Sequence, residues 1–366
     1  MRALSARRLV FALVASLGIL AVAGVRLAET GTEVRETRFV FGTLVEIVIR
    51  GESAAAAREA AAEAGALLQT LHHDWHAWRP GHLGDLNAAI AAGRPAEIDA
   101  RFAEVLREGR RLACASGGLF EPAIGGLVAL WGFHDDTPPE GAPPSSAAID
   151  ALVAAEPRMA ALSIEGTTAR AENTALQLDL GGFAKGAALD LAGRALQARG
   201  IEDAVLNAGG DVNVLGSHSA RPWRIAIRDP FVWGAVAAVS LRPGEVLYTS
   251  GNYERYFEHG GTRFAHIIDP RTGYPVREIV SVSVLGTSGL RADAAATALS
   301  VAGREHFAAT AAAMGVSAVL MIAEDGEIIA TPAMMARLEP VGEALPAEIT
   351  VTPLPEPAPS VACAAG

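Results

Sequence analysis

The chain has 366 residues and a formal net charge of −11, which excludes the basic footprint that a nucleic-acid-binding protein needs. Hydrophobic residues make up 51% of it and charged residues 19%, so we expect a folded protein with a substantial core, in one large domain or two moderate ones. Its two cysteines, Cys114 and Cys363, are too few for a disulfide framework, and we expect Cys114 to be a packed apolar side chain.

The N-terminus predicts export. Arg2, Arg7 and Arg8 precede an apolar run over residues 9–25, and the small residues around Ala23 are typical of a cleavage site. The run is also nearly long enough to remain as an anchor with its basic end in the cytoplasm. We therefore expect a periplasmic protein, either soluble or tethered to the inner membrane by its N-terminus.

Strand and helix patterns alternate in the first third of the chain. Residues 38–50 alternate and are rich in β-branched residues, which predicts one strand with Gly42 inside it as a bulge or a point of ligand approach. Residues 53–71 predict a helix capped by Ser53, and residues 100–116 predict a second amphipathic helix. Trp78, just before a Pro-Gly turn, is suited either to stack on a planar ligand or to fill the core.

A first chemical signal lies in residues 177–186. We expect a strand over 175–180, a turn at Gly181 and Gly182, and a helix over 183–199. Such a turn presents backbone N–H groups at a helix N-terminus, where anions bind. The glycine spacing matches neither the dinucleotide-binding fingerprint nor the P-loop. With Asp179 and Lys185 on either side, the turn is a candidate phosphate or metal site.

A second signal lies in residues 248–276, after a series of short expected strands over 204–249. Aromatic and β-branched residues surround a Gly-Gly turn, which predicts a β-hairpin. Asp269 and Gly273 then form a tight turn. His266 is expected near the end of a strand, where a rigid scaffold presents it to a ligand.

The third signal follows an expected strand over 279–286. Asp293 and Thr297 are four residues apart in an expected helix, so they share a face and can hold one hard cation through oxygen ligands. An Asp near a helix start is also commonly a cap or a dipole partner. Gly303 closes or bends this helix. A hairpin with an Asp-Gly turn at Asp325 follows, and the Pro-rich chain from Pro340 is expected to be disordered.

Together, the short strands in hairpins and the helices between them predict an α+β fold with mixed or antiparallel sheets, not a doubly wound parallel sheet. Eight stretches, in order, resemble the ApbE-type FAD:protein FMN transferases. They are residues 42–47, 78–80, 118–122, 131–133, 179–186, 207–211, 250–276 and 292–303. The resemblance implies a two-lobed catalytic domain over 38–338, after a signal peptide or anchor (1–25) and a linker (26–37), with a tail over 339–366.

The resemblance also implies a reaction. FAD would bind with Mg²⁺ at its pyrophosphate, and its FMN half would pass to a Thr or Ser hydroxyl of an acceptor protein, such as a respiratory membrane complex, with release of AMP. His266 and Asp293 would be catalytic, and the metal would lie between the backbone oxygen of Gly182 and the side chains of Asp293 and Thr297. The flavin-contacting residues would be Phe41, Trp78, Leu119, Phe120, Glu121, Asp179, Lys185 and Ile268.

The sequence departs from the family at some of these positions. Phe41 and Trp78 stand where Met and Tyr are common, which keeps an apolar or stacking surface. Glu121 stands where Asp is common and is longer by a methylene. Ala296 stands where some members carry a second Asp. Two other activities fit the same residues: Mg²⁺-dependent hydrolysis of FAD to FMN and AMP, and non-catalytic transport of FAD by an exported carrier.

Overall fold

A nine-stranded sheet forms the centre of the structure, a computed structural model that describes residues 33–134, 139–218 and 221–356. Neighbouring strands are antiparallel, except that β17 runs parallel to β15. The strands in spatial order are β1 (Val34–Val40), β2 (Thr43–Arg50), β6 (Asp203–Ala208), β7 (Asp211–Leu215), β10 (Val246–Gly251), β13 (Ile279–Gly286), β14 (Ala318–Ala323), β15 (Ile328–Ala330) and β17 (Thr350–Val351).

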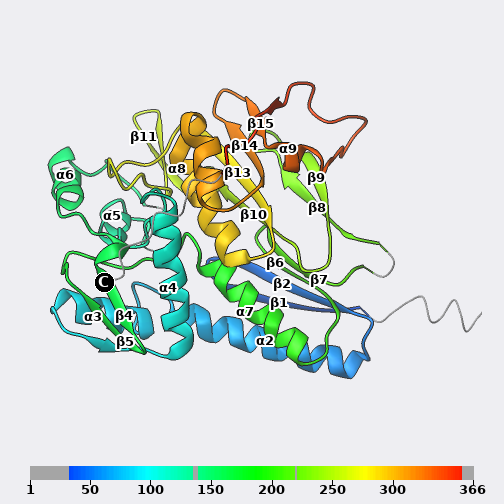
Figure 1. Ribbon diagram of the computed structural model, residues 1–366, viewed down its shortest axis with the longest axis horizontal. Coiled ribbons are helices and arrows are strands. Elements are labelled where there is room, and N and C mark those ends of the chain that lie inside the picture. Colours follow the sequence, from blue (N-terminus) through cyan, green and yellow to red (C-terminus); the bar gives the residue numbers. More distant parts are fainter. Residues whose placement is uncertain (1–32, 135–138, 219–220, 357–366) are drawn as a thin grey trace, which may run out of the picture.

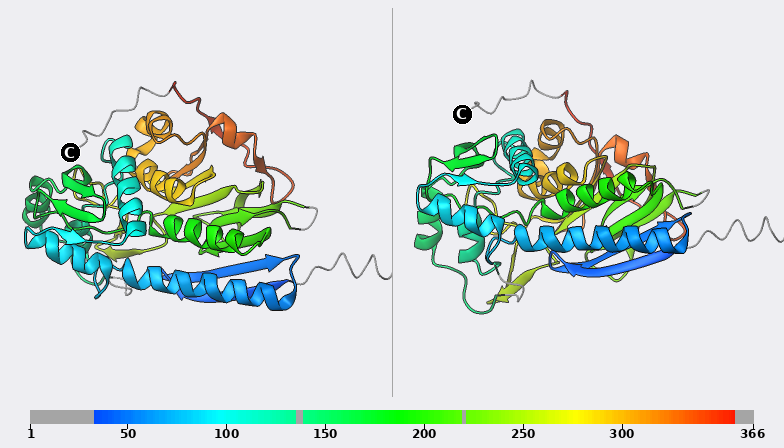
Figure 2. Two further views of the ribbon diagram at one scale, coloured as in Figure 1. Left: turned by 60° about the horizontal axis from the view of Figure 1, so that its bottom comes forward. Right: turned by 90° about the horizontal axis from the view of Figure 1, so that it is seen from below.

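Both faces of this sheet are covered. The helices α2 (Ala54–Asp74), α7 (Ala184–Ala198) and α8 (Gly289–Ala313) pack on one face (Figures 1 and 2). A three-stranded sheet of β8 (Trp223–Arg228), β9 (Ala235–Leu241) and β16 (Leu338–Glu339) shares a second apolar cluster with the other face. The central strand β13 is therefore buried along nearly its whole length, and its Ile and Val residues are accompanied by two buried serines, Ser281 and Ser283.

A smaller group of elements lies at one end of the sheet (Figure 1). The helix α4 (Ala100–Ala115) joins this group to α8, and the hairpin of β11 (Tyr256–His259) and β12 (Thr262–Ala265) contributes to an apolar cluster around Trp131. The other members are α3 (His82–Ala91), β3 (Ala96–Glu97), α5 (Gly125–Leu130), α6 (Ser146–Ala154), the 3₁₀ turn η1 (Met159–Ala161), β4 (Leu162–Glu165) and β5 (Thr168–Ala171).

Short sequence motifs correctly predicted several secondary-structure elements. The side chain of Ser53 caps α2 by accepting a hydrogen bond from the Ala56 N–H at 3.2 Å. Gly303, with φ of 68° and ψ of −175°, is non-helical and forms a kink within α8. A further helix, α9 (Pro332–Met335), follows the predicted hairpin of β14 and β15. The α+β class is confirmed.

The first predicted strand was wrong in its extent. Residues 38–50 belong to two antiparallel strands, β1 and β2, because Phe41 and Gly42 both have positive φ (53° and 71°) and form a two-residue turn. β1 begins at Val34, inside the segment expected to be a linker. The strand expected over 175–180 is also not formed. There the Leu178 N–H bonds the side chain of Asn87, and the Asp179 N–H bonds the Pro122 carbonyl.

Two further expectations need correction. Cys114 is half-buried and disulfide-bonded, so it is not the free apolar side chain that its helical position predicted. Part of the segment expected to be disordered is ordered, since β17 pairs with β15 and Leu354 packs against the core. The predicted signal peptide lies outside the described residues. Within the described ones, no helix is both long and apolar enough to span a membrane.

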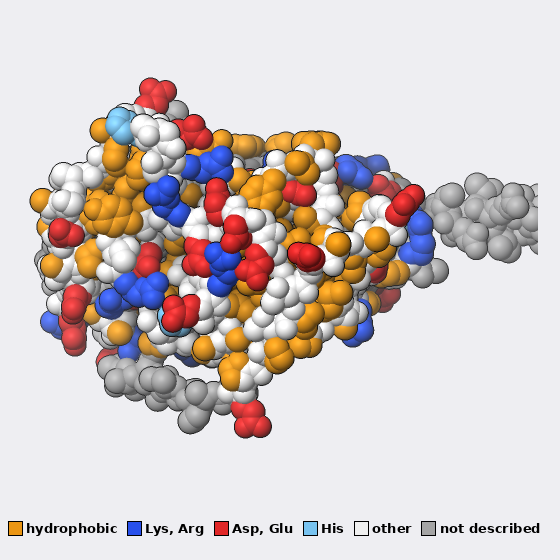
Figure 3. Space-filling view, turned by 90° about the horizontal axis from the view of Figure 1, so that it is seen from above, with side chains coloured by type: hydrophobic (Ala, Val, Ile, Leu, Met, Phe, Trp, Pro, Cys, Tyr) orange, Lys and Arg blue, Asp and Glu red, His pale blue; other side chains and the backbone are white. Residues whose placement is uncertain are grey.

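The surface seen in Figure 3 mixes acidic and basic side chains. A group of exposed ion pairs joins α8 to the β14–β15 hairpin through the guanidinium of Arg304. This guanidinium lies 2.8 Å from Glu278, 2.7 Å from Asp325 and 2.9 Å from Glu327. Because these pairs are exposed, each contributes little to stability.

Candidate active site

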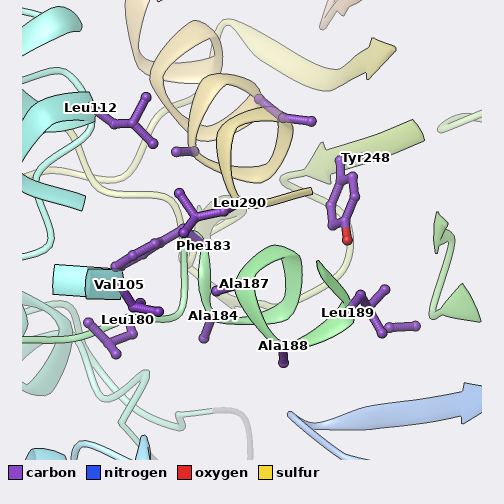
Figure 4. Close-up of a cluster of buried hydrophobic side chains, with 14 of the residues drawn as sticks. Val105, Leu112, Leu180, Phe183, Ala184, Ala187, Ala188, Leu189, Tyr248 and Leu290 are labelled. Atoms are coloured by element: carbon purple, nitrogen blue, oxygen red, sulfur yellow. The ribbon is translucent and has the colours of Figure 1, made fainter. Parts of the chain in front are cut away.

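The segment before α7 holds Asp179 in one orientation. Its Oδ1 accepts a hydrogen bond from the Gly181 N–H at 2.8 Å, and its Oδ2 accepts one from the indole Nε1 of Trp78 at 3.3 Å. Phe183 points from the start of α7 toward Leu290 and α4, which fixes this end of the helix in the core (Figure 4). Trp78 and Asp179, predicted from separate motifs, are therefore neighbours.

The three predicted metal ligands also converge. Asp293 is only 4% exposed, and its Oδ2 accepts a hydrogen bond from the Gly186 N–H of α7 at 2.9 Å. The hydroxyl of Thr297, one turn further along α8, donates to the Gly182 carbonyl at 3.3 Å and to the Asp293 carbonyl at 3.2 Å. Three oxygen donors from two segments thus meet at the N-terminus of α7.

This donor set fits a magnesium ion that also binds phosphate. Among the described residues, no cluster of three His, Cys, Asp or Glu side chains could hold a metal. Mg²⁺, however, is commonly held by one or two carboxylates, with the rest of its shell left to water and substrate phosphates. None of the described residues donates a hydrogen bond to Oδ1 of Asp293, so one carboxylate oxygen is open. Burial raises the pKa of Asp293 to about 7.

Lys185, in the first turn of α7, forms an ion pair with Asp211 at the start of β7. Asp211 is 2% exposed, and its other oxygen accepts a hydrogen bond from the Thr249 N–H of β10 at 2.9 Å. Burial alone would lower the pKa of Lys185, but the carboxylates of Asp211 and Asp293 raise it above its usual value. Lys185 is therefore an ammonium facing two acids.

A neighbouring network fixes the elements that carry this centre. Asp190 of α7 accepts hydrogen bonds from the Gly289 N–H at 2.8 Å and the Leu290 N–H at 3.1 Å, so it caps α8. Asn213 of β7 donates to Asp190 at 2.8 Å and accepts from the hydroxyl of Tyr248 at 2.6 Å. Sequence reasoning gave no role to Asp190 or Asp211, because their partners lie 23 to 100 residues away.

His266 follows β12, as predicted. Its Nδ1 lies 3.2 Å from the carbonyl oxygen of Arg255, so an Nδ1–H donates there and Nε2 is left with its lone pair. Burial, together with the positive charges of Arg255 and Lys185, lowers the pKa of His266 to about 4.

The other predicted flavin contacts lie on several different elements. Phe120 is 2% exposed and packs edge-on against Phe183, with 5.4 Å between the two ring centroids. Leu119 is only partly buried. Phe41 lies in the β1–β2 turn, and its N–H donates to Nδ1 of His72 at 3.2 Å. Ile268 is buried near Trp131.

Glu121 is 7% exposed, and its Oε1 already accepts hydrogen bonds from the Met159 N–H at 2.8 Å and the Ala123 N–H at 3.2 Å. Burial raises the pKa of its carboxyl to about 7. In the structure Glu121 therefore holds the 3₁₀ turn η1 in place, and its predicted contact with the flavin stays a prediction.

Fold and site together define a class: an α+β protein with an oxygen-rich, charged centre at a helix N-terminus. Two solved structures share this fold. The ApbE protein of Thermotoga maritima superposes with a TM-score of 0.77 and 27% identity, covering 84% of this chain and 100% of that one. The flavin transferase ApbE of Vibrio cholerae superposes with a TM-score of 0.75 and 29% identity, covering 84% of this chain and 100% of that one.

The sequence comparisons identify the family. The sequence profile of the ApbE family matches residues 41–320, and the chain belongs to this family. A protein of Rhodobacter capsulatus named FAD:protein FMN transferase is 59% identical over 340 residues, which are 93% of this chain and 65% of that protein. A protein of the same name from Vibrio cholerae is 35% identical over 239 residues, 64% of this chain and 70% of that protein. The chain thus spans less than two thirds of the Rhodobacter relative.

Proposed function

We propose that this protein transfers FMN from FAD to a Thr or Ser hydroxyl of an acceptor protein, with Mg²⁺ as cofactor and AMP as the second product. Membership of the ApbE family and the names of the relatives support flavin transfer. The observation that carries the proposal is the centre at the N-terminus of α7. A buried carboxylate with one open oxygen and a threonine hydroxyl lie there, and the ammonium group of Lys185 in the first turn of the helix is paired with Asp211.

The centre suits a bound pyrophosphate. Gly182, Asp293 and Thr297 would hold Mg²⁺, which when bound neutralises charge on the phosphates. Lys185 adds a second positive charge, and the N-terminus of α7 contributes its dipole. Trp78, oriented by Asp179, offers an aromatic surface for the planar flavin. Phosphoryl transfer depends mainly on such positioning and charge neutralisation.

The proposed reaction is a substitution at the phosphorus of the FMN half. The acceptor hydroxyl oxygen forms a bond to this phosphorus, and the bond between it and the bridging oxygen breaks, so AMP leaves with that oxygen. The proton of the hydroxyl passes to Nε2 of His266, which is unprotonated at neutral pH because the pKa of the ring is about 4.

The acceptor and the compartment follow from the proposal and from the N-terminal sequence. We infer an exported protein that acts in the periplasm, soluble or tethered to the inner membrane by its first 25 residues. A respiratory membrane complex is the acceptor class that the family resemblance supports. An acceptor of this class would present its Thr or Ser on the same side of the membrane.

One assay separates the three activities that fit the residues. The purified protein is incubated with FAD, Mg²⁺ and a candidate acceptor, and the acceptor mass and the nucleotide products are measured. Gain of the FMN mass by the acceptor supports the transferase. Free FMN with AMP in the absence of any acceptor adduct indicates a hydrolase, and intact bound FAD indicates a carrier.

A further inference from the structure

Two buried carboxylates, those of Asp211 and Asp293, are candidate ion-pair partners for Lys185. Lys185 directly precedes Gly186, whose N–H bonds the Asp293 carboxylate, and the charges of both Asp211 and Asp293 raise the pKa of Lys185. The ion pair forms with Asp211 only. A third acid, Glu254, acts on Lys185 more weakly and lies 3.5 Å from Arg228.

The hydrogen bonds to the two carboxylates explain why Lys185 pairs with Asp211 and not with Asp293. Oδ1 of Asp211 is fixed by the Thr249 N–H, which aims Oδ2 at Lys185. Oδ2 of Asp293 is fixed by the Gly186 N–H, which leaves its Oδ1 open. The backbone thus orients one oxygen of each acid, and the ammonium group neutralises the acid that takes no part in the proposed metal site.

An ammonium group and a metal ion compete for the same carboxylate oxygen. If Lys185 paired with Asp293, it would occupy the oxygen that a cation needs, and a buried ion pair of this kind is costly to break. We propose that Asp211 is a positioning residue, which holds Lys185 away from Asp293 and so keeps the Asp293 carboxylate available to the divalent cation. This inference rests on the proposed function, because it takes Asp293 as a ligand of that cation.

The substitution Asp211→Asn tests the role with little change of shape. The amide oxygen of Asn can still accept from the Thr249 N–H, but its NH₂ group cannot accept from Lys185. We expect Lys185 to pair with Asp293 instead. The probe is Mn²⁺ alone, which takes the same oxygen ligands as Mg²⁺ and is visible in electron paramagnetic resonance. The Mn²⁺ dissociation constant should rise about tenfold or more, which corresponds to about 1.4 kcal/mol of binding free energy.

A second substitution separates positioning from mere support of the fold. In Lys185→Met/Asp211→Asn the competing ammonium is absent, so Mn²⁺ binding should return to within about threefold of the unaltered protein. Asp211→Glu keeps the ion pair and should bind Mn²⁺ as the unaltered protein does. Circular dichroism and thermal unfolding establish that each variant is folded.

The outcomes are distinct. Unchanged Mn²⁺ binding in Asp211→Asn overturns the inference, and so does a double variant that binds as weakly as the single one, because the role of Asp211 would then be structural. If the unaltered protein itself binds no Mn²⁺, or if Asp293→Ala binds it equally well, the metal assignment of the proposed function fails first, and the inference with it.

Discussion

Burial moves the pKa values of three of the predicted site residues, each toward its uncharged form. Asp293 and Glu121 have pKa values raised to about 7, and His266 has one lowered to about 4. A buried site disfavours the charged form of each group, which is a carboxylate in the first two and an imidazolium in the third. The two carboxyl groups therefore become charged only as the pH rises toward 7, whereas the imidazole becomes charged only as the pH falls toward 4.

His266 should act as a base over an unusually wide pH range. Because its pKa is about 4 instead of 6.5, its ring stays unprotonated at pH 5 to 6, where an exposed His is mostly charged. The rate of covalent flavin attachment should therefore not lose this base until the pH falls toward 4. His266→Ala should lower that rate by about 100-fold or more and leave FAD binding intact. Full activity of His266→Ala would remove the role of base.

Glu121 should make stability depend on pH. Its folded-state pKa of about 7 lies above the ordinary 4.5, so its contribution is fully present below pH 4.5 and is lost as the pH rises to 7. The loss is about 3 kcal/mol at most. In Glu121→Gln the amide oxygen can still accept from the Met159 N–H, and this loss should disappear. Urea denaturation at pH values from 4.5 to 8 measures the free energy of unfolding of the unaltered protein and of Glu121→Gln. Equal pH dependence in both would contradict the raised pKa of Glu121.

At the scale of elements, the site depends on how closely α7 approaches the first turn of α8. Gly186 of α7 faces Gly289, and a Cβ built on Gly186 would overlap with the Gly289 carbonyl group. The same close approach lets the Gly186 N–H reach Asp293. Gly186, the last glycine of the motif at 179–186, therefore serves both helix packing and the backbone hydrogen bond to Asp293.

Gly186→Ala should destabilise the protein by about 1 to 3 kcal/mol or more, because neither backbone segment can move aside cheaply. It should also weaken Mg²⁺-dependent activity, since Asp293 would lose its backbone partner. The matched control is Gly193→Ala in the same helix, where the nearest atom to an added Cβ is a Leu215 methyl at 3.8 Å. This control should be neutral or slightly stabilising, as Ala favours a helix. Thermal unfolding compares the two, and equal values would refute the packing argument.

The sequence predicted those features that depend on neighbouring residues. The Ser53 cap, the Asp325 turn and the hairpin that ends just before His266 follow from local chemistry and are confirmed. The pairing of Lys185 with Asp211 and the capping of α8 by Asp190 did not follow, because residues distant in sequence form them. The turn at Phe41 was missed because a positive φ at an aromatic residue has no clear sequence signal.

At the scale of the whole molecule, the proposed site joins segments from most of the chain. Trp78 lies in the turn after α2, Asp179 and Gly182 precede α7, and Asp293 belongs to α8. A ligand that contacts all of these binds the folded protein and not the unfolded chain. Binding should therefore raise the free energy of unfolding of the domain as a whole.

FAD and Mg²⁺ together should stabilise the protein by about 3 kcal/mol when free FAD is at about 100 times its dissociation constant. A chelator should reverse the part that depends on the metal. In Asp293→Ala, FAD should still stabilise the fold, but added Mg²⁺ should increase that effect no further, and transfer of FMN should be nearly abolished. Thermal unfolding with FAD alone, with FAD and Mg²⁺, and after addition of a chelator measures each contribution. A full Mg²⁺ effect in Asp293→Ala would show that the metal binds elsewhere, whereas its loss in this variant alone assigns the cation to the open oxygen of Asp293.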